Sequence, residues 1–242
     1  MEKMKNKVLL KDLGRKPRVV AVLNKASLET AQSARKFGAD ILELRVDMLA
    51  PCYHTGEKAS SVIRQLKKEV KLPVILTIRS SNEGGMAKIA DGRRLDIFRE
   101  AISETDLVDI EISSDRINSK VIELAKTWNK KVILSYHNFE KTPTLPYLKN
   151  QAEKACDLGC DILKIAVTTN NIEDIRSLLN FCSGWKKTKI SVMSMGNLGA
   201  ISRLTGFIFG SCLTYGFIDQ STACGQLSVK NLVKYYRILY PL

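Results

Sequence analysis

A lysine lies in the middle of a short apolar segment of the chain, "DILKIAVTT" at residues 161–169. An apolar run of this length predicts a strand that is covered on both faces. Lysine is seldom buried without a partner, because removing an ammonium group from water is costly. Burial and neighbouring cations favour the neutral amine, which can attack a carbonyl carbon and form an imine. Lys164 is therefore a candidate nucleophile.

A histidine in the preceding apolar segment could serve as its partner. His137 lies near the end of "KVILSYHN", residues 131–138, one predicted strand before Lys164. Imidazole titrates near neutral pH, so it can accept the α-proton that a protonated imine makes acidic. A nearby acid would orient the histidine, and both Glu83, in the loop "RSSNEGG", and Glu111 are candidates. The sequence leaves the choice between these two acids open.

Eight short apolar segments recur along the chain, and amphipathic helical patterns separate most of them. Each segment and its helix take roughly 25 to 35 residues, which is the size of a βα repeat. Eight repeats in 242 residues predict a (β/α)8 barrel, and no glycine-rich phosphate turn of a doubly wound sheet follows the first segment. The predicted strands are 18–24, 41–47, 73–79, 107–112, 131–138, 162–167, 189–195 and 213–219.

The helical and loop segments support the same repeat. Residues 27–38 predict a helix with Ser27 as its N-cap and Gly38 at its end, and 115–129 predicts another. Residues 48–60 are expected to form a loop. No linker composition interrupts the rhythm, so we expect one domain over residues 1–242, with 1–17 as a basic lead-in to the first strand.

Alternate side chains of a barrel strand point to the barrel axis and to the helices outside it. Leu163 and Ile165 share the outer face of their strand, which places Lys164 inward; Met195 has the same inward parity in 189–195. A barrel interior normally holds branched apolar side chains, so inward charges predict an active site at the carboxyl ends of the strands. A magnesium site is less favoured, because cations share this space. The inward ionisable residues are Glu43, Arg45, Asp47, Arg79, Asp109, Glu111, His137 and Lys164.

The composition limits the class of protein. The formal net charge is +13, but the basic residues are spread along the chain and no aromatic-interleaved nucleic-acid motif is present. No apolar run approaches the ~20 residues of a membrane helix. The amino terminus lacks the apolar core of a secretory signal, and the six cysteines have no paired CxxC spacing. We expect a cytoplasmic protein with reduced thiols, without a nucleic-acid or membrane partner.

An ordered set of motifs covers nearly the whole chain and resembles the type I 3-dehydroquinate dehydratase family. Each motif alone is weak evidence for the family, but the motifs occur in order and each lies at the end of the appropriate strand. The motifs are "ELRVD" (43–47), "TIRSSNEGG" (77–85), "DIEIS" (109–113), "SYHNF" (135–139), "KIAV" (164–167), "SMGNLGAISR" (194–203) and "STACGQ" (221–226).

The resemblance implies a (β/α)8 homodimer that removes water from 3-dehydroquinate to give 3-dehydroshikimate, without a metal or an organic cofactor. Lys164 would form the imine, His137 would transfer protons and Glu83 would orient His137. Arg203 would hold the substrate carboxylate. The other residues that the resemblance places at the substrate are Glu43, Arg45, Arg79, Thr222, Ala223 and Gln226, with Asp109, Glu111 and Met195 in support.

The chain departs from the family pattern at a few positions. Thr222 and Cys224 stand where the last motif usually has serine and proline, and Leu44 stands where tryptophan is common. Thr222 keeps a hydroxyl group. Cys224 removes a fixed φ from what resembles a mobile lid, so we expect an effect on lid closure rather than on the chemistry.

Two other functions compete with this interpretation. A class I Schiff-base aldolase also needs an inward lysine on a late strand, but its phosphate substrates would use backbone amides after the last two strands. This chain has Arg203 and Gln226 there, which suit a carboxylate and hydroxyl groups. A non-catalytic basic barrel that binds a polyanion would leave the inward charges unexplained.

Overall fold

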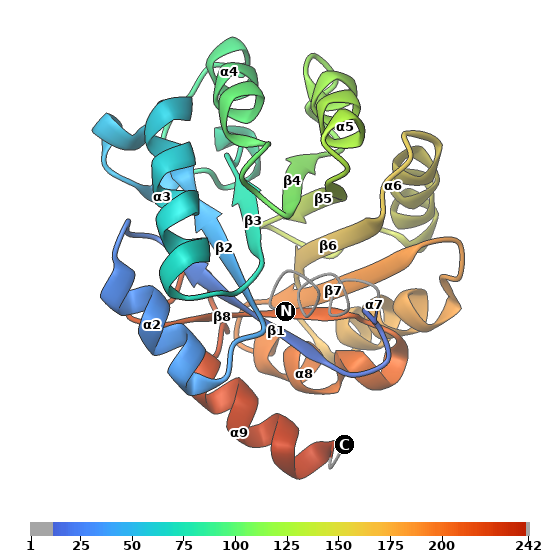
Figure 1. Cartoon of the computed structure of the whole chain (residues 1–242). Helices are drawn as coiled ribbons and strands as arrows, with labels where there is room; N and C mark the ends of the chain where they lie inside the picture. The colour runs from blue at the N-terminus through green and yellow to red at the C-terminus, as the bar shows by residue number, and fades with distance from the viewer. Residues whose placement is uncertain (1–11, 241–242) are drawn as a thin grey trace.

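Eight parallel strands form the centre of the molecule, and the helices surround them (Figure 1). The computed structural model describes residues 12–240. Between β7 and β8 the barrel closes through a bridge of Ile190 with Ser211, and the Cys212 N–H donates to the Ile190 carbonyl at 2.8 Å. The predicted barrel is confirmed. Its strands, in the order β7-β6-β5-β4-β3-β2-β1-β8, are β1 (Arg18–Leu23), β2 (Ile41–Arg45), β3 (Val74–Thr77), β4 (Leu107–Glu111), β5 (Lys131–Asn138), β6 (Ile162–Thr168), β7 (Lys189–Met195) and β8 (Leu213–Phe217).

Helices follow the strands and pack outside them. The α-helices are α2 (Leu28–Phe37), α3 (Gly56–Glu69), α4 (Asp91–Ala101), α5 (Asn118–Thr127), α6 (Leu145–Asp157), α7 (Ile172–Gly184), α8 (Gly199–Thr205) and α9 (Val229–Leu239). Short 3₁₀ turns occur at η1 (Val46–Met48), η2 (Pro51–Tyr53), η3 (Ser81–Glu83) and η4 (Gly206–Phe209).

The predicted helix ends are partly right. The Ser27 hydroxyl accepts the Thr30 N–H, and Gly38 takes the left-handed conformation at φ 96°, as expected for the caps of α2. The loop predicted over 48–60 is wrong in its second half, because Thr55 caps the Lys58 N–H and α3 begins at Gly56. The helix predicted over 115–129 is shorter, since α5 ends at Thr127.

The side-chain alternation predicted for the strands is confirmed. Leu163, Ile165 and Val167 pack in the layer between the barrel and the helices, while Ile162 and Ala166 face the barrel interior with Met193. An error of one residue in the predicted register of a strand would have exchanged its inward and outward side chains.

The barrel interior has an apolar layer below a polar one. The first inward positions of β2 to β6 are the buried Ile41, Ile75, Leu107, Ile133 and Ile162. Two residues further along the same strands, the inward positions are Glu43, Thr77, Asp109, Ser135 and Lys164. Each apolar side chain of the lower layer stabilises the fold by roughly 1.5–3 kcal/mol through burial. This layer closes the amino end of the barrel, so the polar layer opens only toward the carboxyl ends of the strands.

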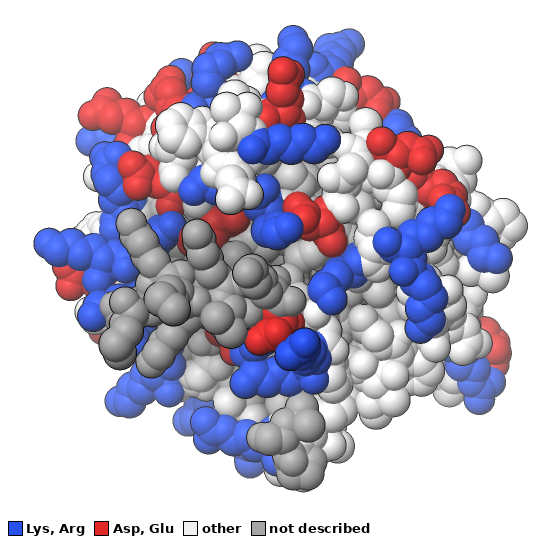
Figure 2. Space-filling model, turned by 45° about the vertical axis from the view of Figure 1, so that its right-hand side comes forward, with Lys and Arg blue, Asp and Glu red and all other residues white. Residues whose placement is uncertain are grey.

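The surface carries the positive charge in dispersed form. Lys and Arg side chains occur over most of the face in Figure 2, with Asp and Glu side chains between them. None of the helices in residues 12–240 has the length and apolar character that a membrane span requires. Of the predicted basic lead-in, residues 1–11 lie outside the described residues.

Candidate active site

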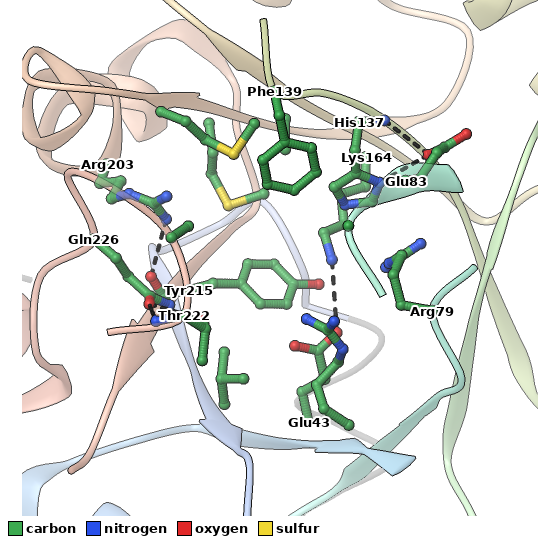
Figure 3. A pocket seen from close by; sticks show the side chains of 17 residues that line it. Glu43, Arg79, Glu83, His137, Phe139, Lys164, Arg203, Tyr215, Thr222 and Gln226 are labelled. Atoms are coloured by element: carbon green, nitrogen blue, oxygen red, sulfur yellow. Dashed lines mark hydrogen bonds and ion pairs between the residues drawn. The ribbon is translucent and has the colours of Figure 1, made fainter. Parts of the chain in front are cut away.

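A pocket that opens to solvent lies at the carboxyl ends of the strands (Figure 3). It brings together most of the site residues predicted from the sequence. The predicted residues that line it are Glu43, Arg45, Arg79, Glu83, His137, Lys164, Met195, Arg203, Thr222, Ala223 and Gln226.

Lys164 lies at the floor of this pocket and is 5% exposed. Its Nζ donates to Asp109 Oδ2 at 2.8 Å and lies 3.6 Å from Glu43 Oε1. The nearest charged groups to this nitrogen are two carboxylates, at the same level of β2 and β4. Only a neutral amine attacks a carbonyl carbon, so an ammonium group must first release a proton.

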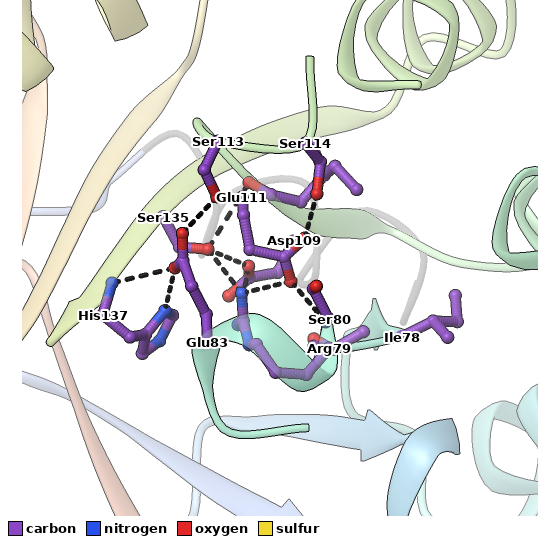
Figure 4. Close-up of polar contacts among 12 residues, drawn as sticks. Ile78, Arg79, Ser80, Glu83, Asp109, Glu111, Ser113, Ser114, Ser135 and His137 are labelled. Carbon is purple, nitrogen blue, oxygen red and sulfur yellow. Dashed lines mark hydrogen bonds and ion pairs between the residues drawn. The ribbon is translucent and has the colours of Figure 1, made fainter. Parts of the chain in front are cut away.

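Buried ion pairs below the pocket fix this floor (Figure 4). Arg79 donates to Asp109 Oδ1 at 2.8 Å and to Glu111 Oε1 at 2.9 Å, and Arg94 from α4 pairs with the other oxygen of Glu111. Burial alone would raise the pKa of Asp109, but the charges of Arg79 and Lys164 outweigh it and lower that pKa. Asp109 and Glu111 thus lie beneath the pocket rather than on its surface.

Arg94 was not among the predicted site residues. It lies on a helix, where the strand alternation that found the other charges does not apply. Its Nε also donates to the Ile78 carbonyl at 2.9 Å, so it is anchored at the end of β3. Removing one partner from such a buried network leaves an uncompensated charge, which costs about 3–5 kcal/mol in measured cases.

A second set of contacts holds Glu43 and Arg45 at the wall of the pocket. Glu43 Oε1 accepts the Thr77 hydroxyl at 2.9 Å. Arg45 donates to both oxygens of Asp47 at 2.9 and 2.8 Å. Asp47 also accepts the Arg79 backbone N–H at 3.1 Å, so it joins the ends of β2 and β3. These bonds leave both pocket side chains in defined positions.

His137 is held by Glu83, and this resolves the choice that the sequence left open. Its Nδ1 lies 3.0 Å from Glu83 Oε2, which also accepts the His137 backbone N–H at 2.9 Å. The Ser113 hydroxyl donates to the other oxygen of Glu83. A carboxylate at Nδ1 favours the tautomer with its proton there and leaves Nε2 free as a base. Glu111 instead pairs with the two arginines.

Burial also tunes both partners of this pair. Desolvation, followed by the charges of Arg79 and Lys164, lowers the pKa of His137 well below its ordinary value, so the imidazole is neutral. Desolvation raises the pKa of Glu83 to about 7, although the hydrogen bond from Ser113 and the positive charge of Arg79 both act to lower it. A neutral histidine beside a carboxylate is suited to accept a proton.

We expect kcat/KM to fall as the pH drops below about 7, because Glu83 then takes up a proton. The protonated carboxyl is a weaker acceptor for the Nδ1 proton, so the tautomer with a free Nε2 is favoured less. A pH–rate profile of the free enzyme measures this decline. Glu83→Gln cannot titrate, so its profile should lie lower and lack this acidic limb. The same limb in both proteins would contradict the assignment.

Arg203 is a buried cation without an acidic partner among the described residues. It comes from α8, is 3% exposed, and donates from Nη1 to the Tyr215 carbonyl at 3.1 Å. Its Nε has no hydrogen-bond partner, and desolvation lowers its pKa to about 10. A buried guanidinium that lines a pocket and lacks a counter-charge favours an anionic ligand, such as a carboxylate.

The loop of residues 218–228 covers this side of the pocket. Gln226 Oε1 accepts the Thr222 backbone N–H at 2.8 Å and the Thr222 hydroxyl at 2.9 Å. Gly225 has φ 75°, and a Cβ there would lie 2.2 Å from the Gly196 carbonyl oxygen. Only glycine permits this close approach, which seats the loop on the turn after β7.

Six pocket residues lie outside the predicted site: Val22, Gly84, Phe139, Ala166, Met193 and Tyr215. The ring of Phe139 stacks on His137 with centroids 6.5 Å apart. Tyr215 shares its face of β8 with Leu213, and both belong to the interior cluster. The alternation applied to the other strands would have identified Tyr215.

A (β/α)8 barrel with a buried lysine and a histidine at the carboxyl ends of neighbouring strands has the geometry of an imine-forming enzyme. The family model of Type I 3-dehydroquinase matches residues 19–242, and the chain belongs to this family. The family resemblance inferred from the motifs is confirmed.

Relatives and solved structures agree over most of the chain. The chain is 41% identical over 204 residues to 3-dehydroquinate dehydratase of Hydrogenobaculum sp., covering 84% of this chain and 89% of the relative. It is 37% identical over 236 residues to 3-dehydroquinate dehydratase of Methanosarcina barkeri, covering 94% and 97%. The crystal structure of 3-dehydroquinate dehydratase from Aquifex aeolicus matches with a TM-score of 0.84 at 33% identity, covering 93% of this chain and all (100%) of that one.

A structure of Type I 3-dehydroquinate dehydratase from Clostridium difficile with covalent modified comenic acid matches with a TM-score of 0.85 at 29% identity, covering 93% of each chain. These matches support the dehydratase over the aldolase and the polyanion-binding barrel.

Proposed function

We propose that this chain removes water from 3-dehydroquinate to give 3-dehydroshikimate through an imine on Lys164. The observation that carries the proposal is the joint placement of three groups in one pocket. Lys164 lies at its floor, His137 lies on the adjacent strand β5, and Arg203 is a buried cation without an acidic partner among the described residues. A ketone with a carboxylate on the same ring meets all three groups.

The first step joins the Lys164 nitrogen to the ring ketone carbon. The C=O bond breaks, its oxygen leaves as water, and a protonated imine remains. His137 then takes a proton from the carbon beside the imine, and the electron pair of that C–H bond moves toward the nitrogen. The hydroxyl group on the next carbon departs with a proton returned by His137. Water finally hydrolyses the imine and releases the product.

The remaining residues would hold the substrate or the two reacting side chains. Glu83 would stabilise the tautomer of His137 that carries its proton on Nδ1. The floor formed by Asp109, Arg79 and Glu111 would hold Lys164 in position. Arg79 is bound by carboxylates, so we assign it to positioning. The side chains proposed to contact the ring hydroxyls or to close over them are Glu43, Arg45, Thr222, Ala223 and Gln226, with Met195 packed beside the ring.

Replacement of Arg203 by Met is expected to raise KM by about 10- to 100-fold, because the substrate carboxylate loses a charge-assisted hydrogen bond. The effect on kcat should be smaller, because the carboxylate does not react. Steady-state kinetics measures both constants. The matched control is Arg176→Met, since Arg176 is an exposed arginine on α7. An unchanged KM in Arg203→Met would contradict the assignment of the carboxylate.

The proposed reaction makes a conjugated product, so ultraviolet absorbance follows it directly. The folded protein should convert 3-dehydroquinate without added metal or cofactor. Absence of product from folded protein would contradict the function. The homodimer and the cytoplasmic location expected from the sequence stay predictions, and sedimentation analysis measures the first of them.

A further inference from the structure

Tyr215 occupies a central position in the pocket that the predicted site did not include. It comes from β8, is 3% exposed, and lines the pocket. Its ring lies over Lys164, with 4.2 Å between Nζ and the ring centroid. Figure 3 shows its hydroxyl pointing toward Lys164 and Glu43, away from Arg203.

The hydroxyl of Tyr215 has no hydrogen-bond partner among the described residues, although its oxygen is buried. Buried hydroxyl groups are nearly always hydrogen-bonded, because an unpaired one loses its interaction with water without replacement. Because Tyr215 lines the pocket, a ligand bound there could supply the missing acceptor. The orientation of Tyr215 places that acceptor at the lysine end of the pocket.

The surroundings of this hydroxyl keep it protonated. Desolvation, followed by the charges of Glu43 and Asp109, raises the pKa of Tyr215 well above its ordinary value. Loss of the proton would place a third negative charge beside these two carboxylates. Tyr215 is therefore a hydrogen-bond donor and does not transfer its proton.

We propose that Tyr215 is a further catalytic residue, whose hydroxyl donates a hydrogen bond to the oxygen on the carbon that Lys164 attacks. This inference rests on the proposed function. When the N–C bond forms, the π bond of the ketone breaks and its electron pair moves to this oxygen, where a donor stabilises the developing charge. Two protons reach the oxygen, one released by Lys164 before the attack and one from the nitrogen of the adduct; the C–O bond then breaks, water leaves and the protonated imine remains.

The ring of Tyr215 has a separate effect on the same step. Its face lies over the Lys164 nitrogen, which carries positive charge as the ammonium and again as the protonated imine. An aromatic face attracts such a cation. Replacement by Phe removes the hydroxyl and keeps the ring, so the two effects can be separated.

The test measures the rate at which borohydride-trapped imine accumulates in a single turnover with 3-dehydroquinate. Tyr215→Phe should form the imine about 10- to 100-fold more slowly than the unmodified protein, as expected for loss of a hydrogen bond to a charged oxygen. In Tyr215→Phe, Arg203 should still bind the substrate carboxylate. The change in KM should therefore be smaller than the change in the trapping rate. Tyr215→Leu, which also lacks the ring, should be slower still.

Tyr136→Phe is the matched control, because Tyr136 is a buried tyrosine of the outer layer and does not line the pocket. Its trapping rate should equal that of the unmodified protein. Imine formation at the unmodified rate in Tyr215→Phe would overturn the role of the hydroxyl. Failure of the proposed function is distinguishable, because the unmodified protein would then give no trapped imine.

Discussion

Replacement of Lys164 by Met is expected to lower kcat by on the order of 10⁴-fold or more, as for other enzymes that lose their nucleophile. Methionine has a similar length and no amine, so the imine cannot form. Steady-state absorbance assays measure the loss.

The same variant should remain folded. Asp109, the partner of Lys164, keeps its bonds to Arg79 at 2.8 Å and to the Ser135 hydroxyl at 2.6 Å. Thermal unfolding beside the assay separates loss of chemistry from loss of fold. Lys189→Met is the control, because Lys189 is an exposed lysine at the opposite end of β7. A folded Lys164→Met protein with kcat near that of the unmodified protein would refute the covalent mechanism.

Replacement of His137 by Gln is expected to lower kcat by about 10²- to 10⁴-fold, the range for removal of a general acid–base group. Glutamine can still hydrogen-bond Glu83, but it cannot take the proton from the carbon beside the imine. Because Lys164 remains, borohydride should still trap an adduct in this variant. Steady-state kinetics and intact-mass spectrometry measure the two outcomes.

The chain offers a direct control for this variant, since its other histidine lies outside the pocket. His54 is partly exposed and its Nε2 contacts the Leu49 carbonyl at 2.9 Å, so His54→Gln should keep full activity. A His137→Gln protein within tenfold of the unmodified kcat would show that another group transfers the proton.

The alternation of apolar and polar residues predicted the barrel and much of its site. In β6 it placed Lys164 inward between the outward Leu163 and Ile165, and the structure confirms that arrangement. The reason is physical: a strand between two packed layers has two fixed faces, so one buried face determines the other.

Contacts that depend on loops and helices were beyond this pattern. Glu83 belongs to η3 and Arg94 to α4, so strand parity gave neither the pairing of Glu83 with His137 nor that of Arg94 with Glu111. The start of α3 was also missed, because the apolar residues of segment 48–60 gather before the N-cap Thr55, and only Ala59 follows it within the segment. Which charge stands next to Lys164 depended on the stagger between strands, and the sequence does not specify it.

The most direct test of the imine mechanism is a search for the covalent intermediate on Lys164. The protein is mixed with 3-dehydroquinate and borohydride, and intact-mass spectrometry with peptide mapping then locates any reduced adduct. We expect one stable adduct, on the peptide that contains Lys164, and none in Lys164→Met. Product formation without an adduct, or an adduct on another lysine, would contradict it.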